Sequence, residues 1–383
     1  MWNRILGQER IKNLLRGAIE RERVAHAYLF YGEEGAGMDA VAIEFARVLN
    51  CEQGGLDSCG LCSSCRQFEN LQHPNLRVIF ALPRGKSERN DESPINALTD
   101  PEIKLLQEQL RLKARNPYHQ IEVPKGNEIR INSIRELRRE ASLSAFAEGW
   151  KVFLILEADR MNDEASNALL KTLEEPTPKT VLILTTSKRE RLLPTILSRC
   201  QPVKFDSLTS EEISHALVTR HSVSLEQAQL VATLANGSFT RALDLLDTDV
   251  RETRDAVVEF VRSALGNRPT KLFEQIEELA ATFDRLALQR WLSLMLVWFR
   301  DAEAIRQGRL AGIVNVDQLD SLQRFVTNCP TVDHSRVIST VEEAIALVGK
   351  NVYLPLVLAD LAYRLKEAIP VVTKESLIEK KTE

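Results

Sequence analysis

The sequence predicts an α/β domain built on a parallel sheet, followed by helical domains. Apolar runs of strand length alternate with amphipathic helical stretches through the first half of the chain, which favours parallel strands with both faces covered. Strand-like runs stop after Phe205, and helical periodicity continues from there. The length of 383 residues allows two or three domains, because a single core rarely grows past roughly 250–300 residues.

Five apolar runs bounded by polar or turn-forming residues are predicted as strands. They are 26–31, 76–82, 151–156, 180–186 and 202–205. Helices are predicted between them at 40–49, 134–144, 163–175 and 190–197. Residues 83–128 break the alternation with a polar, turn-rich stretch and a helix at 102–115. We interpret them as an insertion that decorates the domain surface rather than one that contacts a partner.

The rest of the chain is predicted as helices. Three short ones follow the fifth strand, and Asn236 and Gly237 supply a turn before the third. They are 210–220, 224–234 and 239–246. From about Val250 the chain is helical almost throughout. The predicted domains are therefore an α/β domain at 1–207, a small helical domain at 208–249 and a larger helical domain at 250–383.

Composition and charge argue against several classes of protein. The sequence has no run of about 18 apolar residues, so we expect no membrane span. Residues 1–4 lack the apolar core of a signal peptide, so we expect a cytoplasmic protein. A net charge of −4 argues against a strongly basic nucleic-acid binder, although it is compatible with a local basic face in an assembly.

The turn after the first predicted strand has the spacing of a phosphate-binding loop without its chemistry. The nucleotide-binding pattern is G-x-x-x-x-G-K-[ST]; Gly32 and Gly37 occupy its glycine positions, and Gly35 lies between them. Met38 replaces the lysine, and Asp39 replaces the hydroxyl that holds Mg²⁺. A thioether cannot neutralise phosphate charge, and a carboxylate repels it. We therefore expect no nucleotide here; a glycine-rich turn with no ligand at all would have the same spacing.

A second acidic motif ends the third predicted strand. In ATPases with this type of loop, a strand ends in Asp-Glu, which supplies the Mg²⁺ ligand and the group that activates water. Here Leu156 occupies the Asp position, while Glu157 remains at the position of the general base. The alternative is that Glu157 and Asp159 are only strand-end carboxylates that cap a helix beginning near Asn162.

Four of the six cysteines are crowded into a module at 51–65. They are Cys51, Cys59, Cys62 and Cys65. In a cytoplasmic chain such crowding favours metal binding over disulfides. Four thiolates form a closed tetrahedral Zn²⁺ site with no open position for catalysis, so we predict structural zinc. Free buried thiols or an iron–sulfur cluster are the alternatives. Cys200 and Cys329 are isolated and are predicted as core residues.

Ser198 and Arg199 follow the helix predicted at 190–197 and precede the fifth strand. An arginine at this place can complement the negative end of a helix dipole. It can also reach the phosphates bound by a neighbouring subunit, as arginine fingers do. The spacing alone does not choose between these two roles.

Taken in order, these motifs resemble the bacterial DNA polymerase III clamp-loader subunits of the AAA+ class. The resemblance covers about residues 2–247. It is carried by the loop, the four cysteines and four short runs, which are I-L-G-Q at 5–8, H-A-Y-L-F at 26–30, N-A-L-L-K-T-L-E-E-P at 167–176 and T-I-L-S-R-C at 195–200. It implies an AAA+ nucleotide-hydrolase-like sheet domain, a small helical lid domain and a C-terminal helical collar domain for oligomerisation.

The family has two similar types of subunit. The gamma/tau motor type binds and hydrolyses ATP, whereas the delta-prime type keeps the fold without hydrolysing ATP. Met38, Asp39 and Leu156 all depart from the motor pattern. The resemblance implies that motor subunits have the pattern G-S-x-R-x-A-L in the small helical domain. Residues 237–243 of this chain read G-S-F-T-R-A-L instead. Arg241 is thereby displaced by one residue, about 100° around a helix, away from a γ-phosphate. These departures favour the delta-prime type.

The resemblance also implies roles and partners. Arg199 would act in trans as an arginine finger in the ATP site of a motor neighbour, with Ser198 orienting its turn. The implied partners are the gamma/tau and delta subunits and, within the assembled complex, the sliding clamp and primer–template DNA. The implied task is to help load the clamp on primed DNA during replication.

Two other functions compete with this interpretation. An active ATPase motor with an unusual loop predicts ATP binding by the purified chain. A zinc-dependent nucleic-acid-binding module predicts tight, salt-sensitive DNA binding, which the net charge of −4 disfavours. We expect neither intrinsic ATPase nor polymerase activity, since paired metal-binding carboxylates for nucleotidyl transfer are not evident. A polymerase activity would belong to the DNA-directed DNA polymerase III holoenzyme, of which the chain would be a component.

Overall fold

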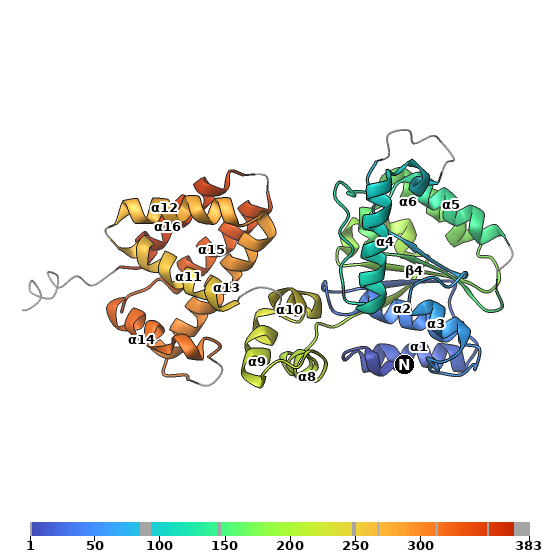
Figure 1. Ribbon diagram of the computed structural model, residues 1–383, viewed down its shortest axis with the longest axis horizontal. Coiled ribbons are helices and arrows are strands. Elements are labelled where there is room, and N and C mark those ends of the chain that lie inside the picture. The colour runs from blue at the N-terminus through green and yellow to red at the C-terminus, as the bar shows by residue number, and fades with distance from the viewer. Residues whose placement is uncertain are drawn as a thin grey trace, which may run out of the picture. The chain divides into compact units, whose positions relative to one another are not determined.

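The structure is a computed structural model that describes residues 2–84, 93–143, 147–246, 250–266, 268–310, 313–350 and 352–370. The chain forms two compact units. The α/β unit comprises Met1–Val223 and Ala235–Leu243, and the helical unit comprises Ser224–Leu234 and Asp244–Glu383. Figure 1 shows both units.

A five-stranded, wholly parallel sheet forms the centre of the α/β unit, as the sequence predicts. Its strands are β1 (Ala27–Tyr31), β2 (Leu76–Ile79), β3 (Lys151–Ile155), β4 (Thr180–Thr186) and β5 (Gln201–Lys204). Their order across the sheet is β2-β3-β4-β1-β5. Because β1 lies between β4 and β5, the turn that follows β1 emerges beside the end of β4. Ligand sites of parallel sheets form at this carboxyl edge.

Helices cover both faces of the sheet, and alternating strand residues fill the two cores. Leu29 and Phe153 pack with residues of α5 and α6 on one face. On the other face, the ring of Tyr28 lies edge-on to that of Phe45, on α2, at 5.6 Å. Figure 1 shows α5 and α6 on the opposite side of the sheet from α1, α2 and α3. Burial on both faces explains why these strands appear in the sequence as continuous apolar runs.

The helices of the α/β unit match most of the predicted ones. They are α1 (Glu9–Glu20), α2 (Met38–Leu49), α3 (Ser63–Phe68), α4 (Asp100–Arg115), α5 (Ile131–Ser142), α6 (Asp163–Glu174), α7 (Pro194–Leu197), α8 (Ser210–His221) and the start of α10 (Phe239–Leu246). The first part of the insertion, 85–92, lies outside the described residues.

The helix predicted at 190–197 is wrong in its first half. The structure has a 3₁₀ turn at Arg189–Arg191 and a separate short helix, α7, that begins at Pro194. Between them Leu193 is extended (ψ 135°), because the ring of a proline disfavours helical backbone in the residue before it. This break positions Ser198 as the C-terminal cap of α7, directly before Arg199.

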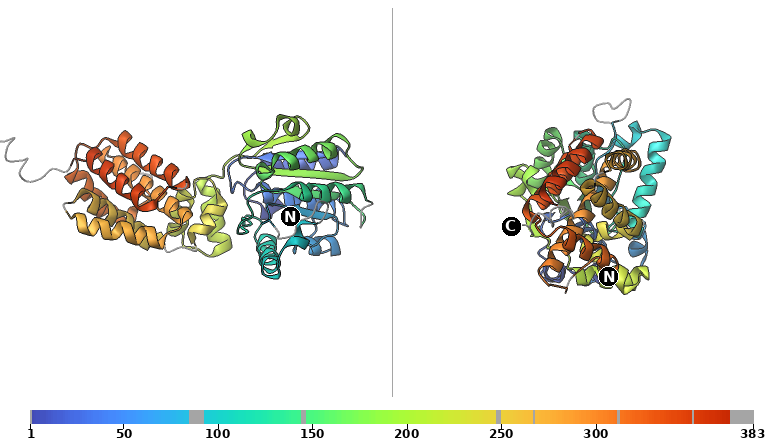
Figure 2. Two further views of the ribbon diagram at one scale, coloured as in Figure 1. Left: turned by 90° about the horizontal axis from the view of Figure 1, so that it is seen from above. Right: turned by 90° about the vertical axis from the view of Figure 1, so that its left-hand side faces the viewer.

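The helical unit packs around one apolar core, in which Phe260, Trp291 and Phe299 are fully buried. Its helices are α9 (Leu225–Leu234), α11 (Val250–Leu265), α12 (Pro269–Thr282), α13 (Arg285–Arg306), α14 (Leu319–Asn328), α15 (His334–Gly349) and α16 (Leu354–Ala368). Figure 2 shows the C-terminal helices, orange to red, running alongside one another. Among the helices that the structure describes, none is long and apolar enough to cross a membrane.

A buried carboxylate organises the segment between α13 and α14. Asp301 is 1% exposed, and its Oδ2 accepts hydrogen bonds from the backbone N–H groups of Val314 (3.0 Å) and Asn315 (2.8 Å). It also accepts one from the Asn315 side chain at 2.7 Å, and the buried Arg254 donates to that same amide. Such a network stabilises a fold only while every polar member has a partner.

We expect Asp301→Ala to lower the free energy of unfolding of the helical unit by about 3 kcal/mol, because three buried N–H groups lose their acceptor. Urea unfolding followed by tryptophan fluorescence measures this change. Asp360→Ala, which removes an exposed carboxylate on α16, is the matched control and should cost less than about 0.5 kcal/mol. Equal losses in the two variants would contradict the role of the network.

Candidate functional site

Three strand ends and an inserted segment surround a small cavity at the carboxyl edge of the sheet. The turn after β1 contributes Gly35 and Gly37, β3 is followed by Glu157, and Thr185 lies at the end of β4. The cavity also meets Lys113 of the insertion, and its volume is about 70 Å³.

The loop keeps the backbone shape of a phosphate-binding turn. Gly35 and Gly37 have positive φ angles of 78° and 98°, and α2 begins at the next residue, Met38. The Gly35 carbonyl accepts a hydrogen bond from the backbone N–H of Phe239 at 3.1 Å. A Cβ on Gly35 would lie 2.0 Å from the hydroxyl of Ser238, so only glycine permits this approach to the start of α10.

The two residues that depart from the nucleotide-binding pattern have partners inside the chain. Met38 is buried, at 8% exposure. Asp39 Oδ2 lies 2.6 Å from Nζ of Lys113, a lysine on α4 whose side chain is 2% exposed. The same ammonium donates to the carbonyl of His119 at 2.7 Å. The loop therefore contacts a cation of the insertion. Whether the insertion decorates the surface or contacts a partner stays a prediction.

The acidic strand end is also engaged within the chain. Leu156 is buried, and Glu157 has left-handed backbone, with φ 47°. Its carboxylate pairs with Arg160 at 2.8 Å and accepts a bond from Gln120 at 3.4 Å. Burial, together with the nearby charge of Glu157, raises the pKa of Glu34 on the loop. Two carboxylates at this cavity disfavour an anionic ligand.

The suggestion that Glu157 and Asp159 cap the next helix is wrong. Asn162 caps α6, because its side chain accepts the backbone N–H of Ala165 at 2.9 Å. Asp159 instead accepts a hydrogen bond from the hydroxyl of Thr186 at 2.6 Å, so it joins the strand ends together.

Thr240 occupies the position at which motor subunits are expected to have arginine. It lines the cavity, and its hydroxyl donates to the backbone carbonyl of Tyr118 at 2.7 Å. Arg241, one residue further along α10, is exposed and is not among the residues that line the cavity.

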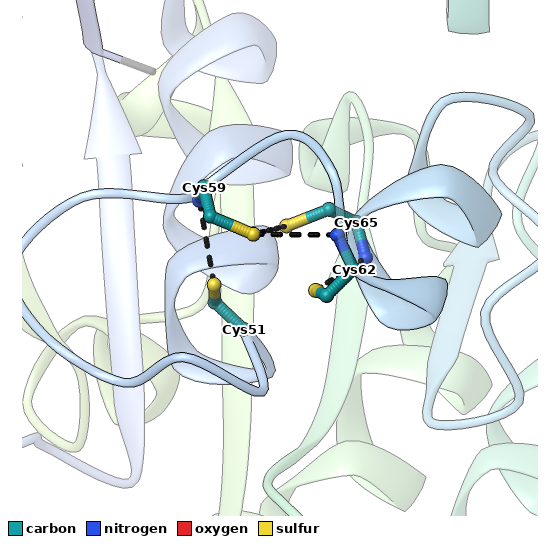
Figure 3. A group of neighbouring side chains, drawn as sticks. All are labelled: Cys51, Cys59, Cys62 and Cys65. Carbon is teal, nitrogen blue, oxygen red and sulfur yellow. Dashed lines mark hydrogen bonds between the residues drawn. The ribbon is translucent and has the colours of Figure 1, made fainter.

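The four clustered cysteines converge on one point, as the spacing predicts (Figure 3). Their sulfur atoms all lie within 4.8 Å of one another, and Sγ of Cys59 is 3.9 Å from Sγ of Cys65. Zn–S bonds of about 2.3 Å at tetrahedral angles separate the sulfurs by about 3.8 Å. A disulfide requires about 2.05 Å. The group can therefore hold one metal ion.

Local hydrogen bonds favour the thiolate form of Cys59, which is the form that binds a metal ion. Backbone N–H groups of Leu61 and Cys62 each donate to Sγ of Cys59 at 3.4 Å and hold the pKa of that thiol well below its ordinary value. Burial raises the pKa of Cys65, so its thiolate needs a nearby positive charge. The buried Arg47 guanidinium interacts with this sulfur, and a metal ion would supply further charge.

Arg199 lies on the surface, away from the residues that line the cavity. Its side chain is 35% exposed, and its guanidinium pairs with Glu174 at the end of α6 at 2.7 Å. It also donates to the carbonyl of Thr195 at 3.0 Å and contacts Oγ of Ser198 at 3.4 Å. Cys200 is 6% exposed, and burial raises its pKa to about 12, so it is a neutral core residue.

Sequence reasoning missed the residues of the insertion that line the cavity. Lys113 and Leu106 are seven residues apart and are the two buried positions of α4. A lysine on the buried face of an amphipathic helix predicts a buried counterion, and this was the available signal. Nothing in the local pattern indicates Tyr118, whose contacts depend on tertiary structure.

Comparisons with known proteins agree on one family. Residues 7–209 match the family model described as DNA polymerase III, delta subunit. The chain is 27% identical over 363 residues to DNA polymerase III subunit delta' of Bacillus subtilis (strain 168), covering 94% of this chain and 96% of that protein. It is 32% identical over 250 residues to subunit delta' of Pseudomonas aeruginosa, covering 64% of this chain and 63% of that protein. Subunit tau of Bacillus subtilis is 28% identical over 266 residues, covering 66% of this chain but 39% of tau.

We expect the purified chain to contain one metal ion, because four thiolates converge without any open ligand position. Elemental analysis by mass spectrometry measures this content. Cys59→Ser should lose most of the metal, whereas Cys329→Ser, a buried cysteine of the helical unit, should retain it. A metal-free wild-type chain, or equal metal content in the two variants, would refute the site.

Proposed function

The chain belongs to the DNA polymerase III delta subunit family, and on this premise we propose that it is a delta-prime-type clamp-loader subunit. It helps to load the sliding clamp on primed DNA during replication and does not hydrolyse ATP itself. The full-length match to a delta' protein supports this type over the gamma/tau motor, because the tau match covers 39% of that relative.

One observation carries the non-hydrolysing assignment. Asp39 stands where a Mg²⁺-holding hydroxyl is required, and its carboxylate is neutralised by Lys113 of the same chain. Met38 cannot supply phosphate-binding charge, and Leu156 cannot hold a metal ion. The α/β unit thus keeps the shape of an AAA+ domain while its ATP site has lost the groups that bind phosphate and Mg²⁺.

We assign the active contribution of the chain to Arg199, acting in trans. Its guanidinium is partly exposed, and its partner Glu174 is 49% exposed. An exposed ion pair contributes only about 0–1 kcal/mol, so a phosphate presented by a neighbouring motor subunit can replace Glu174. There Arg199 stabilises the charge that develops on the transferred phosphoryl group. Ser198, which contacts the guanidinium, orients the turn.

The proposal also includes a structural metal ion and several partner proteins. We propose that the cysteine centre holds structural Zn²⁺, since four thiolates favour this ion and leave no catalytic position. The proposed partners are the gamma/tau and delta subunits, with the sliding clamp and primer–template DNA met only in the assembled complex. The helical unit would serve as the oligomerisation collar, and the protein would act in the cytoplasm as part of the DNA polymerase III holoenzyme.

We expect Arg199→Ala to leave folding and assembly intact but to lower the DNA-stimulated ATPase of the reconstituted loader. Loss of an arginine finger lowers the rate at the site that it serves by about 10³–10⁵ fold. Other motor sites in the ring retain their own fingers, so single-turnover hydrolysis measures the affected site better than the steady-state rate does.

Arg23→Ala, which removes another exposed arginine of the α/β unit, is the matched control and should leave the ATPase unchanged. Size-exclusion chromatography of the reconstituted complex establishes that both variants assemble. An Arg199→Ala loader that assembles normally and hydrolyses ATP at the wild-type single-turnover rate would remove the arginine-finger assignment.

A further inference from the structure

Residues 113–120, here called the plug segment, include five of the residues that line the cavity at the carboxyl edge of the sheet. The segment begins at the end of α4 and continues past its C-terminus. Its first member, Lys113, reaches Asp39 in the first turn of α2. A lysine that is 2% exposed must be paired, because an isolated buried ammonium is strongly disfavoured. The plug segment therefore supplies the positive charge that the loop itself lacks.

Tyr118 joins three further parts of the α/β unit. Its hydroxyl oxygen accepts the backbone N–H of Leu6 at 2.8 Å. Its ring lies edge-on to Phe239 of α10, with centroids 4.9 Å apart. It also faces the loop so closely that a Cβ on Gly37 would lie 3.3 Å from the ring. Burial raises the pKa of Tyr118 to about 12, so it stays a neutral phenol at physiological pH.

The plug segment is anchored at both the strand ends and α4. Gln120 donates to Glu157 at 3.4 Å. On the other side, the side-chain oxygen of Gln109 on α4 lies 2.9 Å from the ring of His119. That oxygen also accepts the backbone N–H of Glu122 at 3.1 Å. These contacts join the segment, and Glu122 just beyond it, to α4 and to the residue that follows β3.

A ligand in this cavity would contact the loop, the strand ends and the start of α10, and the plug segment contacts the same three elements. The Thr240 hydroxyl donates to the Tyr118 carbonyl, and the Phe239 N–H donates to Gly35. We propose that the plug segment is a built-in ligand that fills the degenerate nucleotide site and fixes the first turn of α10 to the loop without any nucleotide. The contacts between the loop, the plug segment and the start of α10 would then not depend on the binding or release of a nucleotide.

The first test is hydrogen exchange of the purified full-length chain, read at peptides that cover 235–243. Tyr118→Ala removes the ring and should raise the exchange rate of these amides at least about tenfold. Thr240→Val removes only one hydroxyl bond in a side chain of the same shape, and it should raise the rate about threefold. Lys104→Ala, an exposed position of α4, is the control and should leave the rate unchanged.

Thr240→Val keeps the test decisive if Tyr118→Ala fails to fold. Circular dichroism identifies a variant that has lost the fold as a whole. Exchange at 235–243 that equals wild type in folded Thr240→Val would overturn the proposal, because the plug segment would then not be holding α10.

The second test asks whether the plug segment, rather than the loop sequence alone, excludes nucleotide. Met38→Lys supplies the lysine of the loop pattern and keeps the ion pair between Asp39 and Lys113, yet we expect no MgATP binding in calorimetry while the plug segment remains in place. Adding Tyr118→Ala in the same background removes the ring that faces the loop and should bring saturable binding into the measurable range. Micromolar binding before the plug is altered, or no gain afterwards, would contradict the proposal. Neither test uses other subunits, so failure here leaves the clamp-loader assignment standing.

Discussion

The ion pair between Lys113 and Asp39 is the contact on which the organisation of the sheet edge depends. It joins the insertion to the first turn of α2, 74 residues away in the sequence. A carboxylate in the first turn of a helix is favourable by itself, because the N-terminus carries partial positive charge. The buried lysine has no such support, and loss of one member of a buried pair costs about 3–5 kcal/mol. The pair therefore favours an insertion folded over the loop.

With the insertion packed against the loop, the groups at this edge of the sheet make contacts within the chain. The glycine-rich turn keeps its positive φ angles, but its carbonyls and side chains contact α10 and α4. Glu157 contacts Arg160 and Gln120 of the same chain. By contrast, the side chain of Arg199 is 35% exposed and pairs with Glu174, which is itself exposed. Arg199 is thus accessible to another molecule, as the proposed role in trans requires.

Much of the fold could be predicted because it is encoded locally. The central strands β1, β3 and β4 are buried on both faces, so they appear as continuous apolar runs, and Asn162 is a residue type that caps helices. The cysteine centre was predictable from spacing alone. The missed features depend on distant contacts or on one backbone restriction. The helix predicted at 190–197 did not take into account that Pro194 disfavours helical backbone in the residue before it. The role of Lys113 could not be predicted without knowing that α4 packs against the loop.

Equilibrium binding of MgATP to the purified wild-type chain tests the central claim most directly, with a motor subunit as the positive control. A loop that lacks the phosphate-binding lysine, and whose Asp39 is paired with Lys113, predicts no saturable heat at millimolar nucleotide. Micromolar affinity, accompanied by Mg²⁺-dependent hydrolysis, would contradict the account and identify the chain as an active motor.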